Sequence, residues 1–128
     1  MNKQEKGKLG EELTIKKYIR EGYKLLEKNY RFKNIGEIDI ILSKKYNNEL
    51  IIVFCEVKTR KFNKNYIPAE AVTKNKQKKI INVAKYYLVN HNLYEKTLVR
   101  FDVAEVIENN NHYLINIIEN AFYWLETW

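Results

Sequence analysis

Two apolar runs that contain acidic residues constrain the fold of this chain more than any other feature. Residues 35–42 (IGEIDIIL) and 50–58 (LIIVFCEVK) carry acids where a buried strand is normally apolar. The segment YNNE at 46–49 separates them, and asparagine tolerates the positive φ that a two-residue hairpin turn requires. If the two asparagines form that turn, the strands pair so that Asp39 lies directly opposite Glu56.

This pairing predicts a metal site. Directly opposed side chains share one face of a sheet, with Cβ atoms roughly 4.5–5.5 Å apart. Two facing carboxylates on a half-buried sheet repel each other and lose solvation unless something neutralises them. A divalent cation would do so, and we therefore expect Asp39 and Glu56 to be metal ligands.

The register of the hairpin decides whether this site exists. A three-residue loop would slip the pairing by one and send the two acids to opposite faces, whereas a four-residue loop would keep them on one face. Both faces of both runs are apolar, as in a sheet that is covered on both sides. The alternation of side chains therefore leaves these possibilities open.

Length and composition predict one domain spanning residues 1–128, because 128 residues with 45% hydrophobic content can bury one core. The charged N-terminal segment and the lack of any apolar stretch near ~20 residues predict no signal peptide and no membrane span, and we expect a cytoplasmic protein. The single cysteine, Cys55, lies in an apolar run and is expected to be a buried, inert thiol. His91 and His112 lack neighbours at zinc-ligand spacing.

The positive charge is concentrated in one segment. The whole chain has a net charge of +7, and residues 58–79 alone contain eight basic residues and one acid. A local basic cluster is typical of a polyanion-binding surface. The alternative is a composition rich in lysine, 19 Lys against 4 Arg, that merely solvates the surface. We expect nucleic-acid contacts from Arg60, Lys61, Lys64, Lys74, Lys76 and Lys78.

The periodicity predicts an α/β fold in the order helix, three strands, helix, two strands. The expected helices are 6–21, which ends at Gly22, and 73–90; the expected strands are 23–30, the two arms of the hairpin, 98–107 and 112–118. A polar loop spans 60–68. We expect a three-layer sandwich with a central mixed five-stranded sheet flanked by helices. The aromatic tail, 121–128, is unassigned and either packs on the core or contacts another subunit.

The residues Glu56-Val57-Lys58 carry a second chemical signal. Glu56 and Lys58 point to the same face of a strand, about 6.6 Å apart. Alone, this pattern is more often an ion pair at a strand end. With Asp39 opposite, it fits metal-dependent phosphodiester hydrolysis, in which Mg²⁺ or Mn²⁺ takes two carboxylates plus waters and phosphate oxygens. Lys58 would then orient or deprotonate the attacking water, or stabilise developing charge.

These motifs resemble a known family. Asp39 followed by Glu56-Val57-Lys58 resembles the PD-(D/E)xK signature of restriction-endonuclease-like nucleases, although Ile38 replaces the proline. The order of further motifs resembles the YraN-like family, which is grouped with Holliday-junction resolvases: GKLGE at 7–11, GEIDII at 36–41, FCEVKTR at 54–60, PAEAV at 68–72, KQ at 76–77 and RFDV at 100–103. The resemblance extends from residue 7 to residue 122. It implies a nuclease fold, DNA as the partner and Mg²⁺ as the cofactor.

Two assisting residues follow partly from this resemblance. Helical spacing places Glu12 on the apolar stripe with Leu9, Ile15 and Ile19, whereas the Gly-x-x-x-Glu pattern of resolvase-like enzymes points to Glu11. We choose Glu11, because an edge position reaches a cleft and keeps solvent.

Gln77 begins the apolar stripe of the second helix and faces the sheet. Related nucleases carry a glutamine at this place, where it would hold a metal-bound water or a phosphate. The alternative is a buried amide that satisfies groups at the helix end.

Two neighbouring acids are given other roles. Glu37 is expected to face Lys58 across the hairpin, and Asp102, beside Arg100, is expected to be structural.

The sequence therefore predicts a metal-dependent endonuclease acting on DNA, with Asp39, Glu56, Lys58, Glu11 and Gln77 in its site. The first alternative is a nucleic-acid-binding module of the same fold with weak or lost catalysis. The second is an interaction protein that uses its aromatic tail. Cleavage of junctions would suit a homodimer.

Overall fold

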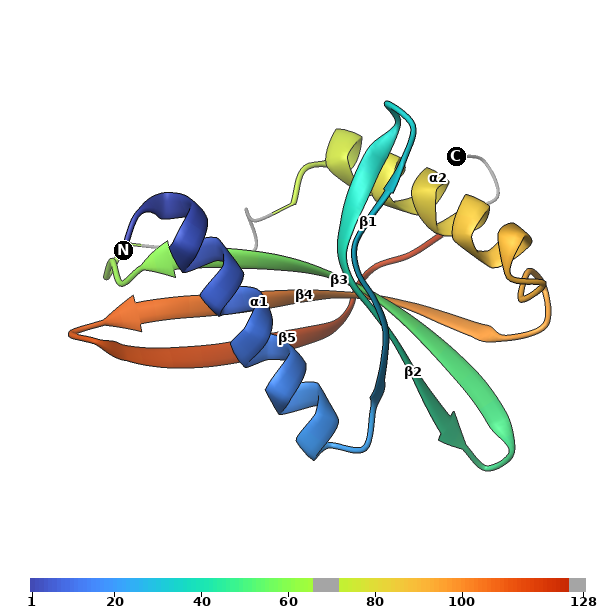
Figure 1. The fold of residues 1–128 in the computed structure, drawn as a ribbon, viewed down its shortest axis with the longest axis horizontal. Helices are drawn as coiled ribbons and strands as arrows, with labels where there is room; N and C mark the ends of the chain where they lie inside the picture. The colour runs from blue at the N-terminus through green and yellow to red at the C-terminus, as the bar shows by residue number, and fades with distance from the viewer. Residues whose placement is uncertain (66–71, 125–128) are drawn as a thin grey trace.

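The computed structural model describes residues 1–65 and 72–124, which form two helices and five strands (Figure 1). The elements follow in the predicted order: α1 Lys3–Arg20, β1 Lys24–Phe32, β2 Gly36–Tyr46, β3 Glu49–Lys61, α2 Lys74–Asn90, β4 Leu98–Asn109 and β5 His112–Phe122. The motif residues 68–71 and the last four residues of the tail lie outside the described part.

The strands form one mixed sheet in the order β1-β2-β3-β4-β5. Only β3 and β4 pair in parallel, because α2 provides the crossover that a parallel connection needs. The two helices cover opposite faces: α2 packs over Phe54 and Phe101, and α1 packs over Val53 and Cys55 (Figure 1). The predicted three-layer α/β sandwich with a mixed five-stranded sheet is confirmed.

The turn between β2 and β3 has the predicted two-residue form. Asn47 and Asn48 adopt φ angles of 52° and 68°, and Tyr46 pairs with Glu49. The register continues without a shift to the pair Ile40–Cys55. Two-residue hairpin turns favour positive φ at both central positions, and asparagine accepts this at low cost. The alternatives of a three-residue or four-residue loop are therefore wrong.

The regular pairing ends one residue before the predicted pair of acids. Ile38 belongs to the core under α2, whereas Ile40 belongs to the core under α1. Residues two apart in a regular strand share a face, so β2 is irregular at Asp39. Asp39 is thus placed where the β2–β3 ladder ends, and its carboxylate is free to accept a hydrogen bond from the neighbouring strand.

Helix α1 differs from the prediction in its start and its buried face. It begins at Lys3, because Asn2 and Glu5 form a reciprocal capping box. Its buried residues are Gly10, Thr14, Ile15 and Tyr18, and Ile19 is 52% exposed.

The expected stripe through Ile19 was therefore wrong. A Cβ at position 10 would collide with Thr59 Oγ1, so the small Gly10 lets the helix approach β3 closely.

The described part of the tail packs on the core. Phe122 ends β5 and is buried, and Trp124 packs against the core under α2. The Trp124 ring contacts Tyr94, with ring centroids 5.6 Å apart, and lies 4.7 Å from Lys85 Nζ. Of the two alternatives for this tail, Ala121, Phe122 and Trp124 follow the first, whereas Tyr123 is exposed.

Two further expectations can be compared with the structure. Cys55 is fully buried, as expected. Across residues 1–65 and 72–124, neither helix is long and apolar enough to cross a bilayer.

Candidate metal and nucleic-acid site

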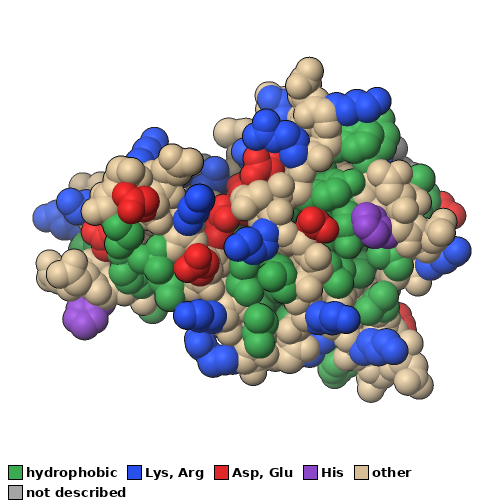
Figure 2. All heavy atoms as spheres, in the orientation of Figure 1, with side chains coloured by type: hydrophobic (Ala, Val, Ile, Leu, Met, Phe, Trp, Pro, Cys, Tyr) green, Lys and Arg blue, Asp and Glu red, His purple; other side chains and the backbone are tan. Residues whose placement is uncertain are grey.

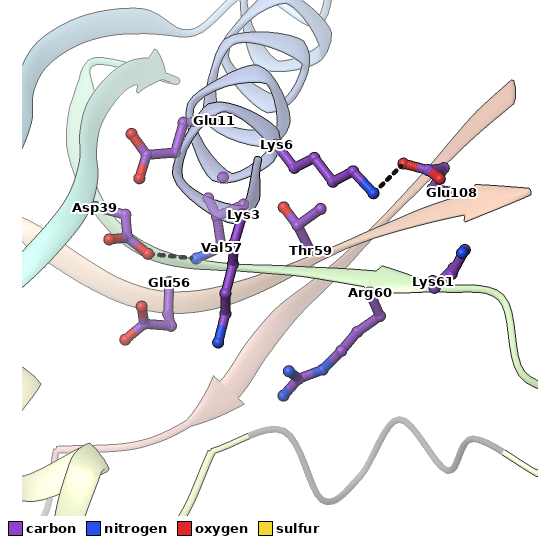
Figure 3. A pocket seen from close by; sticks show the side chains of 11 residues that line it. Lys3, Lys6, Glu11, Asp39, Glu56, Val57, Thr59, Arg60, Lys61 and Glu108 are labelled. Atoms are coloured by element: carbon purple, nitrogen blue, oxygen red, sulfur yellow. Dashed lines mark hydrogen bonds and ion pairs between the residues drawn. The ribbon is translucent and has the colours of Figure 1, made fainter. Parts of the chain in front are cut away.

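A cavity of about 280 Å³ lies between the first turns of α1 and the second half of β3 (Figure 3). Four carboxylates line it, and three of them are predicted site residues from separate elements: Glu11 from α1, Asp39 from β2 and Glu56 from β3. The other lining residues are Lys3, Lys6, Gly7, Val57, Thr59, Arg60, Lys61 and Glu108. The structure therefore brings together three of the five side chains that the sequence placed in the site.

Asp39 is held by the backbone of the neighbouring strand. Its Oδ2 accepts a hydrogen bond of 2.8 Å from the amide N–H of Val57 (Figure 3). The bond is possible because the β2–β3 ladder ends at Ile40 and Cys55, which leaves the Val57 amide without a partner on β2. One carboxylate oxygen is fixed in this way, beside Glu56, with which Asp39 also interacts.

Glu56 is buried and poorly satisfied. Its side chain is 6% exposed, and Oε2 has no hydrogen-bond partner among the described residues. Burial raises the pKa of Glu56 to about 8; the hydrogen bond and the negative charge of Asp39 act in the same direction, and the charges of Lys76 and Lys58 oppose it. The site thus disfavours two negative charges unless a cation is added.

Lys76 supplies part of that compensation. Its Nζ lies 3.6 Å from Glu56 Oε2, and its side chain is 45% exposed. The sequence assigned Lys76 to nucleic-acid contact, and the structure shows it as the ion-pair partner of Glu56 across the α2–sheet interface. No local pattern reveals this pair, since the two residues are 20 positions apart.

The donor set fits a hard divalent cation. Among residues 1–65 and 72–124, no group of three or more His, Cys, Asp or Glu side chains is arranged to hold a metal ion. An ion at Asp39 and Glu56 would therefore complete its coordination with water, a backbone carbonyl or substrate oxygens. Mg²⁺ binds in this way, with one or two carboxylates and several waters. Oε2 of Glu56 has no hydrogen bond and only the Lys76 ammonium at 3.6 Å, so it is an oxygen that such an ion would bind.

Lys58 lies beside this cavity without lining it. It is half-buried on β3, and its positive charge lowers the pKa of Glu56. The expected partner, Glu37, is paired elsewhere: its Oε2 binds Arg31 at 3.0 Å and its Oε1 accepts from Asn29 at 3.1 Å. The expected pairing of Glu37 with Lys58 is wrong, because residue 37 lies beyond the end of the β2–β3 ladder and pairs with β1.

Glu105 is a neighbour of Lys58 that sequence reasoning missed. It faces Lys58 in the parallel β3–β4 register and is fully buried. Its Oε1 accepts a long hydrogen bond of 3.5 Å from Asn116, and its Oε2 has no partner among the described residues. An acid inside the apolar run VAEVI at 103–107 was the available signal.

Between the two candidate helix acids, the structure places Glu11 at the cavity and Glu12 in solvent. Burial raises the pKa of Glu11, and the charge of Asp39 adds to the effect. Asn29 donates to both carboxylate oxygens of Glu11 at 3.3 Å and links this residue to Glu37. Asn29 was not singled out from the sequence; it adopts a φ of 50° within β1.

Gln77 lies apart from the cavity lining, in the first turn of α2. Its Nε2 donates to the carbonyl oxygen of Val72 at 3.2 Å, and its backbone N–H donates to the carbonyl of Thr73 at 2.9 Å. This geometry corresponds to the alternative interpretation, in which the amide satisfies groups at the helix start.

The basic residues divide into two groups. Arg60 and Lys61 line the cavity, as do Lys3 and Lys6 of α1, which the sequence pattern did not indicate. Lys64, Lys74 and Lys78 are exposed and do not line it. On the face drawn in Figure 2, basic and acidic side chains lie interspersed.

Asp102 has the structural role expected for it. It is fully buried and accepts hydrogen bonds from Tyr18 Oη at 2.7 Å and from Arg100 Nε and Nη2, both at 2.9 Å. The buried carboxylate thus ties α1 to β4. Its hydrogen bond raises the pKa of Arg100, although burial opposes that rise.

Comparison with known proteins identifies the family. Residues 10–106 match the sequence model of the Uncharacterised protein family UPF0102. A UPF0102 protein of Clostridioides difficile (strain 630) is 48% identical over 122 residues, covering 95% of this chain and 100% of the relative. A UPF0102 protein of Caldicellulosiruptor bescii is 42% identical over 124 residues, covering 95% and 100%, and one of Clostridium botulinum (strain Kyoto / Type A2) is 44% identical over 119 residues, covering 91% and 92%. The chain therefore belongs to the UPF0102 family, the YraN-like family that its motifs resemble.

Proposed function

We propose that this protein is a metal-dependent endonuclease that hydrolyses phosphodiester bonds in DNA. The observation that carries the proposal is the cavity itself, in which Glu11, Asp39 and Glu56 converge and the most buried of the three lacks a hydrogen bond at Oε2. Lys76 Nζ approaches this oxygen at 3.6 Å, which is an ion pair without a hydrogen bond, and a bound cation would give Oε2 a closer positive partner.

Asp39 and Glu56 would hold the cation, which when bound would neutralise phosphate charge and lower the pKa of a coordinated water. The Val57 amide fixes the Asp39 carboxylate, so little conformational entropy is lost on binding. Glu11, which lines the cavity and whose pKa is raised, would accept a proton there. Lys58 and Lys76 would stabilise negative charge that develops on the phosphate.

The experiment is a cleavage panel of labelled branched, duplex and single-stranded DNA with Mg²⁺ or Mn²⁺, combined with calorimetry of Mn²⁺ binding. The parent protein should cleave at least one substrate and bind Mn²⁺. Asp39→Asn should lose both properties. Lys58→Ala should retain Mn²⁺ affinity and lose cleavage, since a positioned proton-transfer or charge-stabilising group contributes about 10²–10⁴ in rate.

Glu12→Gln is the matched control, because Glu12 is exposed on the helix that carries Glu11. It should behave like the parent in both assays. Cleavage that persists unchanged in Asp39→Asn would show that the activity comes from elsewhere.

A second function, a nucleic-acid-binding module without catalysis, has two specific observations in its favour. Lys76 already neutralises part of the Glu56 charge, and Lys58 lies outside the cavity lining. This module would bind DNA with the same affinity in EDTA and in Mn²⁺, and it would leave every substrate of the panel intact.

A further inference from the structure

An exposed aromatic residue lies at the rim of the carboxylate cavity. Phe62 follows β3 directly, and its side chain is 56% exposed. Its backbone N–H donates a hydrogen bond of 2.7 Å to the carbonyl of Glu108, a residue that lines the cavity. The backbone at Phe62 is therefore fixed against β4, and the exposed ring extends from a constrained position.

The surroundings of Phe62 are basic. Arg60 and Lys61 precede it on the chain, and Lys3 and Lys6 approach from α1 across the same cavity (Figure 3). Lys6 Nζ lies 3.6 Å from Glu108 Oε2, which ties the start of α1 to this rim. An aromatic ring among cationic side chains is the combination that binds single-stranded nucleic acid, because bases stack on the ring while the cations contact phosphates.

The dimensions of the cavity favour one strand over two. At about 280 Å³, it is just below the usual range of small-molecule pockets, and Glu56 inside it is 6% exposed. A phosphodiester must therefore bend into the hollow to reach an ion on Glu56. A single strand can do so, whereas an intact duplex is stiff and keeps its base faces stacked inside the helix, out of reach of Phe62.

We propose that the substrate enters this site as single-stranded DNA, with a base stacked on Phe62 and the adjoining phosphates on Lys3, Lys6, Arg60 and Lys61. This inference rests on the proposed function and specifies the form of its substrate. The single strand is either free or the unpaired part of a larger DNA.

The test measures fluorescence anisotropy of a labelled 16-base single strand and of the corresponding duplex, with the full chain in EDTA so that no cleavage occurs. The parent should bind the single strand more tightly. Phe62→Ala should weaken single-strand binding by about 5-fold or more, since stacking contributes that much per base, and should change duplex binding less than 2-fold. Phe62→Trp should retain the parent affinity.

Tyr46→Ala is the matched control, because Tyr46 is 63% exposed and sits at the β2–β3 turn, outside the cavity lining. It should bind as the parent does. A 2-aminopurine base placed along the strand should lose fluorescence on binding to the parent and regain it with Phe62→Ala.

Two results would overturn this inference: equal single-strand affinity of the parent and Phe62→Ala, or tighter binding of duplex than of single strand by the parent. Because the binding assay contains no metal, it is independent of the cleavage test. A protein that binds single strands through Phe62 and never cuts retains this inference and loses the nuclease proposal. A protein that cuts duplex DNA equally well with Phe62→Ala retains the nuclease proposal and loses this inference.

Discussion

The substitution Glu56→Gln tests the central feature of the site, a buried acid beside a second acid. The folded protein retains a proton on Glu56 up to about pH 8, whereas the unfolded chain releases it near 4.5, because burial and Asp39 raise its pKa. The folded state therefore binds more protons in this window, and its stability must fall as pH rises from about 4.5 through about 8. Glutamine is neutral at every pH and has nearly the same shape.

The size of the effect follows from this pKa interval. At about 1.4 kcal/mol per pKa unit, the interval from 4.5 to about 8 sets an upper bound of about 5 kcal/mol. This pKa already includes the opposing charges of Lys76 and Lys58, and the part of the interval below pH 5 lies outside the measured range. We expect the free energy of unfolding of the parent, relative to Glu56→Gln, to fall by about 2–4 kcal/mol between pH 5 and pH 9.

The assay is urea unfolding in EDTA at intervals across this pH range. Equal m-values at each pH and for both proteins would show that unfolding exposes the same amount of surface in every case. Adding Mg²⁺ at pH 9 should stabilise the parent and leave Glu56→Gln unaffected, since a ligand of the folded state adds about 1.4 kcal/mol for each tenfold excess over Kd.

Glu12→Gln removes an exposed acid from the same chain and should follow the parent curve. Parallel pH profiles for the parent and Glu56→Gln would refute the reasoning, because Glu56 would then carry no buried charge.

Three further predictions concern packing and charge. Gly10→Ala should destabilise the fold by about 1–3 kcal/mol in urea unfolding, since the new methyl group would meet Thr59 Oγ1, whereas Gly7→Ala meets nothing within 4 Å and should be neutral or stabilising. Asp102→Ala should cost about 3–5 kcal/mol in the same assay, because it leaves the largely buried guanidinium of Arg100 with only the exposed Glu119 as its ion-pair partner. Changing Lys61, Lys64, Lys74 and Lys78 together to Ser should lower the slope of log affinity against log salt for duplex DNA by about 0.9 for each phosphate that is no longer neutralised. The same change at four exposed lysines elsewhere, Lys16, Lys24, Lys45 and Lys96, should lower it much less, and equal decreases would indicate a diffuse positive field.

Local patterns were sufficient for the secondary structure and for one decisive register. The turn at Asn47 and Asn48 depends on the φ preference of two residues, so the pairing down to Ile40 and Cys55 could be derived from the sequence. The order of the elements could also be derived, because hydrophobic periodicity depends only on residues close together in the chain. The apolar side chains on both faces of β2 and β3 predicted that both faces are buried.

The buried face of α1 could not be derived in this way. Its apolar residues indicated a stripe through Ile19, whereas close packing on β3 selected the face with Gly10 and Thr14. Helix packing depends on which side chains are small enough to let two backbones approach, and that depends on the partner surface as much as on the helix.

The site likewise combines features that the local sequence determines with features that depend on tertiary packing. The sequence alone determined that Asp39 and Glu56 come from paired strands, because their register is a local property of one hairpin. Helical spacing alone favoured Glu12, and the tertiary structure agrees with the choice of Glu11 that rested on the family resemblance; only the tertiary structure decided that Lys76 crosses from α2 to pair with Glu56. These contacts join segments that are distant in the chain, and their geometry depends on how each helix docks against the sheet, which no short-range pattern specifies.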